Sequence, residues 1–381
     1  MSNLQKICIV ATVPVALRAF MLEHVLELSK KFSITLMANG TAEDLGFDLN
    51  ENITFTPLPI QRKVSIFNDL IALLKLYLFF RDQKFDCVLS LMPKSGLLGM
   101  LSSRMAKVPV RIHIFTGQVW FTKKGIVRFF LKNLDRLLAV CSTNLLADSP
   151  SQKDFLLSER VVNSQKISVL GKGSISGVDV ERFKPDAKLR SEIRRQLAIP
   201  HTDVVFLFMA RLTHVKGIIE LGTAFEQLSG RIPNGHLIVV GPDEENLDPK
   251  LLNLMRSYAG KFHRIGYTQN PEAYMAASDI FCIPSHREGF SLATIQAAGV
   301  GLPAIASKIY GLTDAVEKDV TGIFHEVGSV PELSQSIIRL YNDIDLRERL
   351  SKAATSRAHG DFSQSYIVRE MVEYLSCKII R

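Results

Sequence analysis

Two basic residues and one acidic residue stand where strand-like runs end in the second half of the chain. Arg211 and Lys216 follow the apolar run Val204–Ala210, and Glu288 follows Ile280–Pro284. Arg211 and Lys216 are five positions apart across a turn, so a guanidinium fork and an ammonium point charge can reach the same anion. Glu288 stands at the turn into a helical pattern, where backbone N–H groups also favour anions. The pattern predicts a site for a phosphate-bearing small molecule.

The elements that must position these residues repeat along the chain. Strand-like runs alternate with helical patterns, the rhythm lapses between about Gly177 and Asp203, and it then restarts. This alternation predicts βαβ units and a mostly parallel sheet. A chain of 381 residues exceeds one ordinary core. We therefore expect an α/β fold of two doubly wound, Rossmann-like domains facing a cleft. The expected strands are Ile7–Ala11, Ser33–Ala38, Ile53–Pro57, Cys87–Ser90, Val110–Phe115, Asn144–Asp148, Lys166–Leu170, Val204–Ala210, His236–Gly241, His263–Gly266, Ile280–Pro284, Ala304–Ser307 and Gly322–Phe324.

The composition limits the function classes without choosing one. The net charge of +8 fits acidic small molecules, an anionic membrane surface or nucleic acid. The five cysteines are scattered and form no C-x-x-C, which predicts a reducing compartment and neither zinc nor a disulfide framework. No G-x-G-x-x-G follows the first strand-like run and no P-loop motif occurs, so the phosphate cradles of dehydrogenases and P-loop NTPases are absent. No apolar stretch reaches eighteen residues.

The loop around Glu288 resembles the donor-sugar loop of the retaining family 4 glycosyltransferases, which have the GT-B fold. In that family a glutamate is followed, after seven residues, by a second glutamate; Glu288 matches the first and Gln296 stands at the second. The resemblance implies that Glu288 lies by the donor sugar and Gln296 by the ribose. It also implies that the N–H groups of Gly289, Phe290 and Ser291 bind phosphate. Gln296 keeps an acceptor oxygen but lacks the charge, which weakens the expected ribose contact.

The same resemblance assigns further residues. Arg211 and Lys216 look like the pair that grips the donor diphosphate, and Gly241 matches the usual strand-end glycine. His113 looks like the histidine that family members place near the reacting centre. With these cations, no metal and no cofactor beyond the UDP-sugar donor is expected. The spelling Asp343-Ile344-Asp345 matches a metal-binding Asp-x-Asp, but it lies between two late helical patterns, so we interpret it as a surface turn.

The prediction of residues that bind the acceptor substrate rests on weaker sequence patterns. Gln118 and Trp120 are candidates for shaping the acceptor pocket, because an aromatic ring can stack on a sugar. Lys172 is a candidate for acceptor phosphate, although a purely structural turn fits equally well. The basic, apolar segments Ile66–Arg81 and Phe121–Arg136 fit helices lying in a membrane interface. They also fit core helices with a solvated face.

The resulting prediction is a GT-B enzyme with an acceptor-binding N-terminal domain over residues 1–180 and a nucleotide-sugar-binding domain over 181–360. A terminal helix over 361–381 is expected to cross back to the first domain. Segments of the first half look similar to bacterial polysaccharide and O-antigen transferases. This implies transfer of a hexose or N-acetylhexosamine from a UDP-sugar to an undecaprenyl-diphosphate-linked saccharide, at the cytoplasmic face of the cell membrane.

Alternative functions fit the same residues. One is a GT-B enzyme with a soluble acceptor or an epimerase-like reaction on a sugar nucleotide. Another is an inactive, binding-only member, which Gln296 favours. A nucleic-acid binder would need basic residues interleaved with aromatics on one face, and no such module is present in the sequence.

Overall fold

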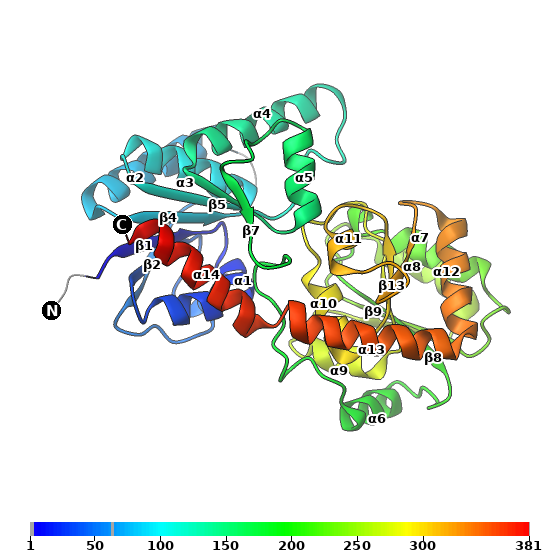
Figure 1. Cartoon of the computed structure of the whole chain (residues 1–381). Coiled ribbons are helices and arrows are strands. Elements are labelled where there is room, and N and C mark those ends of the chain that lie inside the picture. The colour runs from blue at the N-terminus through cyan, green and yellow to red at the C-terminus, as the bar shows by residue number, and fades with distance from the viewer. Residues whose placement is uncertain (1–3, 62–64, 381) are drawn as a thin grey trace. The chain divides into compact units, whose positions relative to one another are not determined.

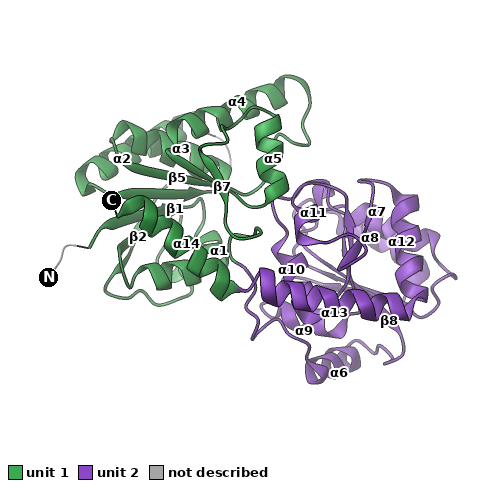
Figure 2. Cartoon of the chain, in the orientation of Figure 1, with its two compact units in different colours: residues 1–176, 364–381 green, residues 177–363 purple. Residues whose placement is uncertain are grey.

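The computed structural model describes residues 4–61 and 65–380. The chain divides into two compact units, here called unit 1 (residues 1–176 with 364–381) and unit 2 (residues 177–363), as Figure 2 shows. The boundaries predicted from the sequence, after residues 180 and 360, lie close to these divisions. The C-terminal helix α14 (Gln364–Ile379) belongs to unit 1.

Unit 1 is built on a seven-stranded sheet in which every neighbouring pair is parallel, with the order β3-β2-β1-β4-β5-β6-β7. Alternate residues of β1 face opposite sides: Ile7 and Ile9 join one apolar core, and Cys8 and Val10 join the other. Both faces are therefore buried, as a doubly wound sheet requires. The strands are β1 (Lys6–Val10), β2 (Ser33–Ala38), β3 (Ile53–Pro57), β4 (Cys87–Leu91), β5 (Val110–Phe115), β6 (Asn144–Ala147) and β7 (Ile167–Val169).

Helices cover both faces of this sheet (Figure 1). The first core includes residues of α1 and α14, and the second includes residues of the helices that follow β3 to β6. Besides α14, the helices of unit 1 are α1 (Pro14–Leu28), the short 3-10 helix η1 (Glu43–Leu45), α2 (Ile66–Gln83), α3 (Pro93–Met105), α4 (Gly125–Cys141) and α5 (Pro150–Ser158).

Unit 2 repeats the plan with six parallel strands in the order β10-β9-β8-β11-β12-β13. Phe206 and Phe208 of β8 face one core, while Val205 and Leu207 face the other. Its strands are β8 (Val204–Met209), β9 (Gly235–Val240), β10 (Phe262–Ile265), β11 (Ile280–Ile283), β12 (Ala304–Ser307) and β13 (Gly322–His325). Its helices are α6 (Ala187–Gln196), η2 (His214–Lys216), α7 (Ile218–Gln227), α8 (Asp248–Leu254), η3 (Met255–Tyr258), α9 (Pro271–Ala277), α10 (Leu292–Val300), α11 (Leu312–Ala315), α12 (Val330–Asn342) and α13 (Ile344–Asp361).

The expected fold class is confirmed, and every expected strand is present within a residue or two of its predicted ends. The helix α5 has a clear start: Ser149 caps it by accepting a hydrogen bond from the Gln152 N–H (3.2 Å), and Pro150 opens it. None of the described helices combines the length and the hydropathy that crossing a bilayer requires.

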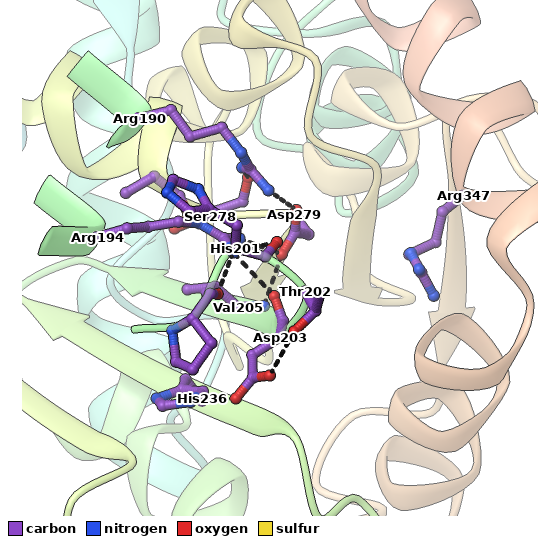
Figure 3. Close-up of polar contacts among 12 residues, drawn as sticks. Arg190, Arg194, His201, Thr202, Asp203, Val205, His236, Ser278, Asp279 and Arg347 are labelled. Atoms are coloured by element: carbon purple, nitrogen blue, oxygen red, sulfur yellow. Dashed lines mark hydrogen bonds and ion pairs between the residues drawn. The ribbon is translucent and has the colours of Figure 1, made fainter. Parts of the chain in front are cut away.

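A buried arginine fixes α6 to the amino end of the unit 2 sheet (Figure 3). The side chain of Arg194 is fully buried, and its guanidinium contacts Asp279 at 2.7 Å, which Arg190 also contacts at 2.6 Å. Asp279 accepts in addition from the Val205 N–H at 2.7 Å. Further donors of Arg194 go to the backbone oxygens of Pro200, His201, Asp203 and Ala277. A buried charge is tolerated because its donors are satisfied in this way.

Candidate functional site

The predicted site residues of unit 2 follow β8 and β11, which are neighbours in the sheet. At this point the strand order reverses, because β9 and β10 lie on one side of β8 while β12 and β13 lie beyond β11. The loops after the two strands therefore diverge and leave room for a ligand at their carboxyl ends. Arg211 and Lys216 lie on the first loop and Glu288 lies on the second.

Lys216 and Glu288 are in direct contact. The Lys216 Nζ lies 2.5 Å from the Glu288 Oε1, and both side chains are largely buried. The same carboxylate oxygen accepts a hydrogen bond from the Ser285 Oγ at 2.9 Å. The structure thus brings together two residues that are 72 positions apart in the sequence, in the place predicted for the donor diphosphate and sugar.

Arg211 is the exposed member of the group. Its side chain is 46% exposed, and its Nη1 lies 2.5 Å from the Glu244 Oε2. The loop that carries it is fixed by a hydrogen bond from the Leu212 N–H to the Pro242 oxygen (2.8 Å). Because one side of its guanidinium is engaged by Glu244 and the side chain remains largely solvated, Arg211 can turn toward an anion at low energetic cost.

Arg287 is a further cation that the sequence analysis did not select. Burial lowers the pKa of this guanidinium, and the nearby charges of Glu288 and Arg211 act on it in opposite directions. Arg211, Arg287 and Glu288 therefore share one electrostatic environment. The signal in the sequence was the position of Arg287, next to Glu288 in a loop at a strand end.

Two glycines allow the loops to approach closely. Gly217 has φ of +72°, and a Cβ at this position would lie 2.0 Å from the Pro284 carbonyl oxygen. Gly241 has φ of +134°, and its Cβ would lie 2.0 Å from the Ala210 oxygen. Any side chain would therefore displace the chain next to Lys216 or Arg211. The contact that the structure shows for Gly241 is thus with the Arg211 loop.

The helix that follows Glu288, α10, begins at Leu292 with Ser291 as its N-cap. Phe290 is buried and packs edge-on against Phe362, with ring centroids 5.4 Å apart. Gln296 lies one turn beyond Leu292 on the same side of the helix and is half-buried. The roles predicted for Gly289, Phe290, Ser291 and Gln296 in donor binding stay predictions.

His113 lies inside β5, within the strand that the sequence predicted. Its ring is buried, its Nδ1 lies 2.9 Å from the Ser90 Oγ, and it packs edge-on against Phe115 with centroids 4.8 Å apart. Burial lowers the pKa of His113 to about 3. The imidazole is therefore neutral near pH 7, suited to a hydrogen bond and not to a positive charge. Its predicted place near the reacting centre stays a prediction.

The expected sugar-stacking role of Trp120 is wrong. Its side chain is 1% exposed, and its ring stacks on Phe155 with centroids 5.2 Å apart. The indole Nε1 donates to the Asp135 Oδ2 at 2.7 Å. The ring and its donor are thus engaged within unit 1, since Arg128 also lies over the ring at 5.0 Å. Trp120 holds its loop against α4 and α5.

The other predicted acceptor residues differ in exposure. Gln118 is buried, and its Oε1 accepts from the Gln152 Nε2 at 3.5 Å, so a contact with an acceptor would require its side chain to move. Lys172 is exposed on the turn that follows β7. Asp343 is the N-cap of α13 and accepts from the Leu346 N–H at 2.9 Å, which agrees with its interpretation as a helix boundary.

Comparison with known proteins identifies the family. The model of the glycosyl transferases group 1 family matches residues 190–357. The capsular polysaccharide biosynthesis glycosyltransferase CapM of Staphylococcus aureus is 30% identical over 315 residues, which cover 82% of each chain. The chain belongs to the group 1 glycosyltransferases. This glycosyltransferase is also 28% identical, over 74% of its length and 73% of the relative's, to an Escherichia coli UDP-Gal:alpha-D-GlcNAc-diphosphoundecaprenol alpha-1,3-galactosyltransferase.

Solved structures show that the glycosyltransferase has the GT-B fold. Sucrose-phosphate synthase from Thermosynechococcus elongatus superposes with a TM-score of 0.81 at 18% identity, covering 98% of each chain. Anabaena HepE, solved in complex with UDP-glucose, gives a TM-score of 0.78 at 18% identity and covers 98% of this chain and 99% of its own. The two-unit architecture predicted from the sequence is therefore that of known glycosyltransferase structures.

Proposed function

We propose that this glycosyltransferase transfers a hexose or N-acetylhexosamine from a UDP-sugar to an undecaprenyl-diphosphate-linked saccharide, with retention of the anomeric configuration. The observation that carries the donor assignment is the contact between Lys216 and Glu288 at the strand-order reversal of unit 2. Support for the acceptor comes from the E. coli relative, whose name specifies a diphosphoundecaprenol substrate.

The charges of the site suit a leaving diphosphate. As the bond from the sugar to UDP breaks, negative charge grows on the phosphate oxygen, and fixed cations stabilise it. Lys216 supplies an ammonium point charge, and Arg211 supplies a fork that matches two phosphate oxygens. Glu288 is placed to accept hydrogen bonds from sugar hydroxyls once Lys216 turns to the phosphate. In this proposal the side chains provide the stabilising charge without a metal ion.

A transfer assay tests the proposal. The full chain is incubated with UDP-sugars and a polyprenyl-diphosphate-linked saccharide, and both released UDP and extended lipid are measured. We expect acceptor-dependent UDP release that Lys216→Ala abolishes, while Lys184→Ala, at an exposed ion pair of the same unit, behaves like the unchanged protein. UDP release without extended lipid would indicate a different acceptor, and no release with any UDP-sugar would contradict the donor assignment.

The exposed apolar side chains of α4 in unit 1 support the proposal of a membrane-linked acceptor. The cations of α4 turn toward the protein: Arg128 and Lys132 contact the two oxygens of Glu159 at 2.7 and 2.5 Å. Apolar side chains in the first half of the helix turn outward, with Ile126 78% and Phe129 63% exposed, while Leu138, Ala139 and Cys141 at its end are buried. The first half of α4 thus departs from an ordinary amphipathic surface helix, whose apolar stripe faces the core.

The helix α2 adds to this apolar surface. Ile66 and Phe67 at its start are 78% and 74% exposed, and α2 and α4 both pack against α3 on one face of the sheet. Lys123 and Lys124 are exposed just before α4. Apolar side chains next to exposed cations suit the interface of an anionic membrane, where apolar groups enter the acyl boundary and lysines meet the headgroups.

Sedimentation with vesicles tests the membrane surface. Vesicles rich in phosphatidylglycerol should pull down the full chain, and replacing Phe129 and Phe130 together by serine should lower the bound fraction several-fold. Leu252 of unit 2 is also exposed, so Leu252→Ser is the matched control and should bind normally. Equal binding of both variants would contradict a membrane-facing α4.

A further inference from the structure

A histidine–glutamate pair lies next to the site without contacting the predicted donor residues. The Nε2 of His286 lies 2.7 Å from the Oε1 of Glu220, which stands in the first turn of α7. The backbone N–H of His286 also donates to the Val215 oxygen at 2.8 Å. His286 therefore joins the loop that carries Glu288 to both the turn that carries Lys216 and the helix that follows it.

The contacts of the two loops alternate along the chain. Ser285 and Glu288 contribute to the cluster with Lys216, while His286, between them, is held by Val215 and Glu220. One set of contacts includes Lys216 and Glu288, which are proposed to meet the donor. The other set, from His286 to Val215 and Glu220, involves neither of these side chains.

This separation matters because the donor competes with Glu288. A phosphate bound to Lys216 takes up the ammonium that now contacts Glu288 at 2.5 Å. The alignment of the two loops in the bound state then cannot rest on the ion pair between Lys216 and Glu288. It needs a contact that ligand binding leaves intact, and preorganisation of this kind improves affinity.

We propose that Glu220 and His286 form a positioning pair that aligns the Glu288 loop with the Lys216 turn and makes donor affinity depend on the protonation of His286. This inference rests on the proposed function and names a control of the same site. Neither residue is a catalytic residue, because both act through the loops they hold.

The charges around the pair place the proton on His286. The hydrogen bond to Glu220 raises the pKa of His286 above its ordinary value, against the opposing effect of burial. Burial alone favours a raised pKa for Glu220, but the hydrogen bond from His286 and the nearby charge of His214 contribute to a net lowering. On the other side, burial lowers the pKa of His325, whose neighbours are Glu326, Glu332 and His286.

The sign of the pH effect follows from the raised pKa. The charged pair contributes fully below the ordinary histidine pKa of about 6.5 and is lost as pH rises through the higher value in the folded protein. Loop alignment, and with it affinity for the donor, should therefore weaken at alkaline pH. A His286→Gln variant keeps a hydrogen-bond donor but has no charge to lose.

Binding of UDP to the full chain, measured by calorimetry from pH 6 to 9, tests the proposal. The quantity to follow is the ratio of the Kd of a variant to that of the unchanged protein, in which ionisation of UDP itself cancels. We expect a ratio of about 3 to 10 at pH 6 for His286→Gln and for Glu220→Gln, falling toward one by pH 9. The double variant should lose no more affinity for UDP than either single variant.

A second pair in unit 2 provides the matched control. His236 contacts Asp203 through Nε2 and Oδ2 at 3.0 Å, at the amino ends of the strands. His236→Gln should leave the Kd ratio at one across the range. A ratio of one for His286→Gln, or a loss that does not change with pH, would overturn the proposal.

One measurement separates this inference from the proposed function. Hydrogen exchange of residues 285–291 without ligand reports loop alignment directly, and His286→Gln should accelerate it while His236→Gln should not. If His286→Gln accelerates exchange but the protein binds no UDP, the positioning role of the pair is supported and the assignment of a UDP-sugar donor is rejected. If the protein binds UDP but His286→Gln leaves exchange unchanged, the donor assignment is supported and the positioning role of the pair is rejected.

Discussion

The two units share the order of their first six strands and differ in the loops at the point where that order reverses. In unit 1 this point lies between β1 and β4, and in unit 2 it lies between β8 and β11. In unit 1 the loop after β1 and the first turn of α3 meet there through neutral groups, with the Thr12 Oγ1 donating to the Ser95 Oγ at 3.0 Å. The loops of unit 2 carry Arg211, Lys216 and Glu288. The same scaffold thus gives an ionic site in one unit and a neutral one in the other.

The nearest cation of unit 1 shows the difference in detail. Lys94 follows β4 as Arg287 follows β11, but its Nζ contacts Asp69 at 2.6 Å with both side chains mostly buried. Its charge ties α3 to α2. The comparison teaches that the sheet order alone does not specify an ionic site, since the loop residues determine which unit carries the charges there.

Replacing each of the two lysines by alanine tests this comparison, and it has the largest expected effect. Lys216→Ala should lower kcat/KM for the UDP-sugar by about 100- to 1,000-fold, because a fixed cation is removed from the developing charge. Lys94→Ala should change kcat/KM by less than about threefold. Steady-state kinetics measure both, with circular dichroism to confirm folding. An equal loss in the two variants would remove the distinction between the units.

The stability of unit 2 depends on the buried Arg194. Arg194→Met leaves Asp279 with fewer partners and should lower the free energy of unfolding by about 3–5 kcal/mol. Arg339 lies 3.5 Å from Asp319 in an exposed pair of the same unit, so Arg339→Met should cost less than about 1 kcal/mol. Urea denaturation compares the two. A small loss for Arg194→Met would mean that packing replaces the buried ion pair.

Much of this architecture could be predicted from the sequence, because parallel strands buried on both faces appear as uninterrupted β-branched and apolar runs. The place of Glu288 followed from its position between such a run and a helix. The burial of Trp120 and His113 could not be predicted, because it depends on Phe155, Asp135 and Ser90 in other elements. The Glu220–His286 contact joins residues 66 positions apart for the same reason.

The stability of unit 1 should depend on pH through Asp135, which lies on α4 beneath its exposed side chains. Burial raises the pKa of Asp135 to about 6, against the hydrogen bond from Trp120. The folded state therefore binds more protons than the unfolded state between about pH 4 and 6, and the contribution of Asp135 to stability falls as pH rises through this window.

Asp135→Asn should remove this penalty and keep an acceptor for Trp120. We expect the variant to be more stable than the unchanged protein by about 1–2 kcal/mol at pH 8 and equal to it near pH 4. Urea denaturation at the two pH values measures the difference. A loss of stability at pH 8 would show that the ionised carboxylate is favourable at this position.

A substitution at Gln296 should have a smaller effect, which concerns UDP affinity at the proposed donor site of unit 2. Gln296→Glu adds a charge to an acceptor that is predicted to meet the ribose hydroxyl, so UDP affinity should rise by no more than about fivefold. Calorimetry measures the affinity and the transfer assay measures the turnover. A rise in turnover of 100-fold or more would show that the natural glutamine impairs the enzyme.

The smallest expected effect is that of a metal chelator. If Arg211 and Lys216 provide the stabilising charge, dialysis against EDTA should leave the transfer rate within experimental error. Loss of activity on dialysis, with recovery on adding Mg²⁺ or Mn²⁺, would show that a divalent cation takes part.

Hydrogen–deuterium exchange with and without UDP tests the central comparison most directly. UDP should slow exchange in residues 211–217 and 285–293 of unit 2. It should leave exchange unchanged in unit 1 around Thr12 and Ser95. Protection confined to the unit 1 loops, or absent from both units at saturating UDP, would contradict the assignment of the donor site to Arg211, Lys216 and Glu288.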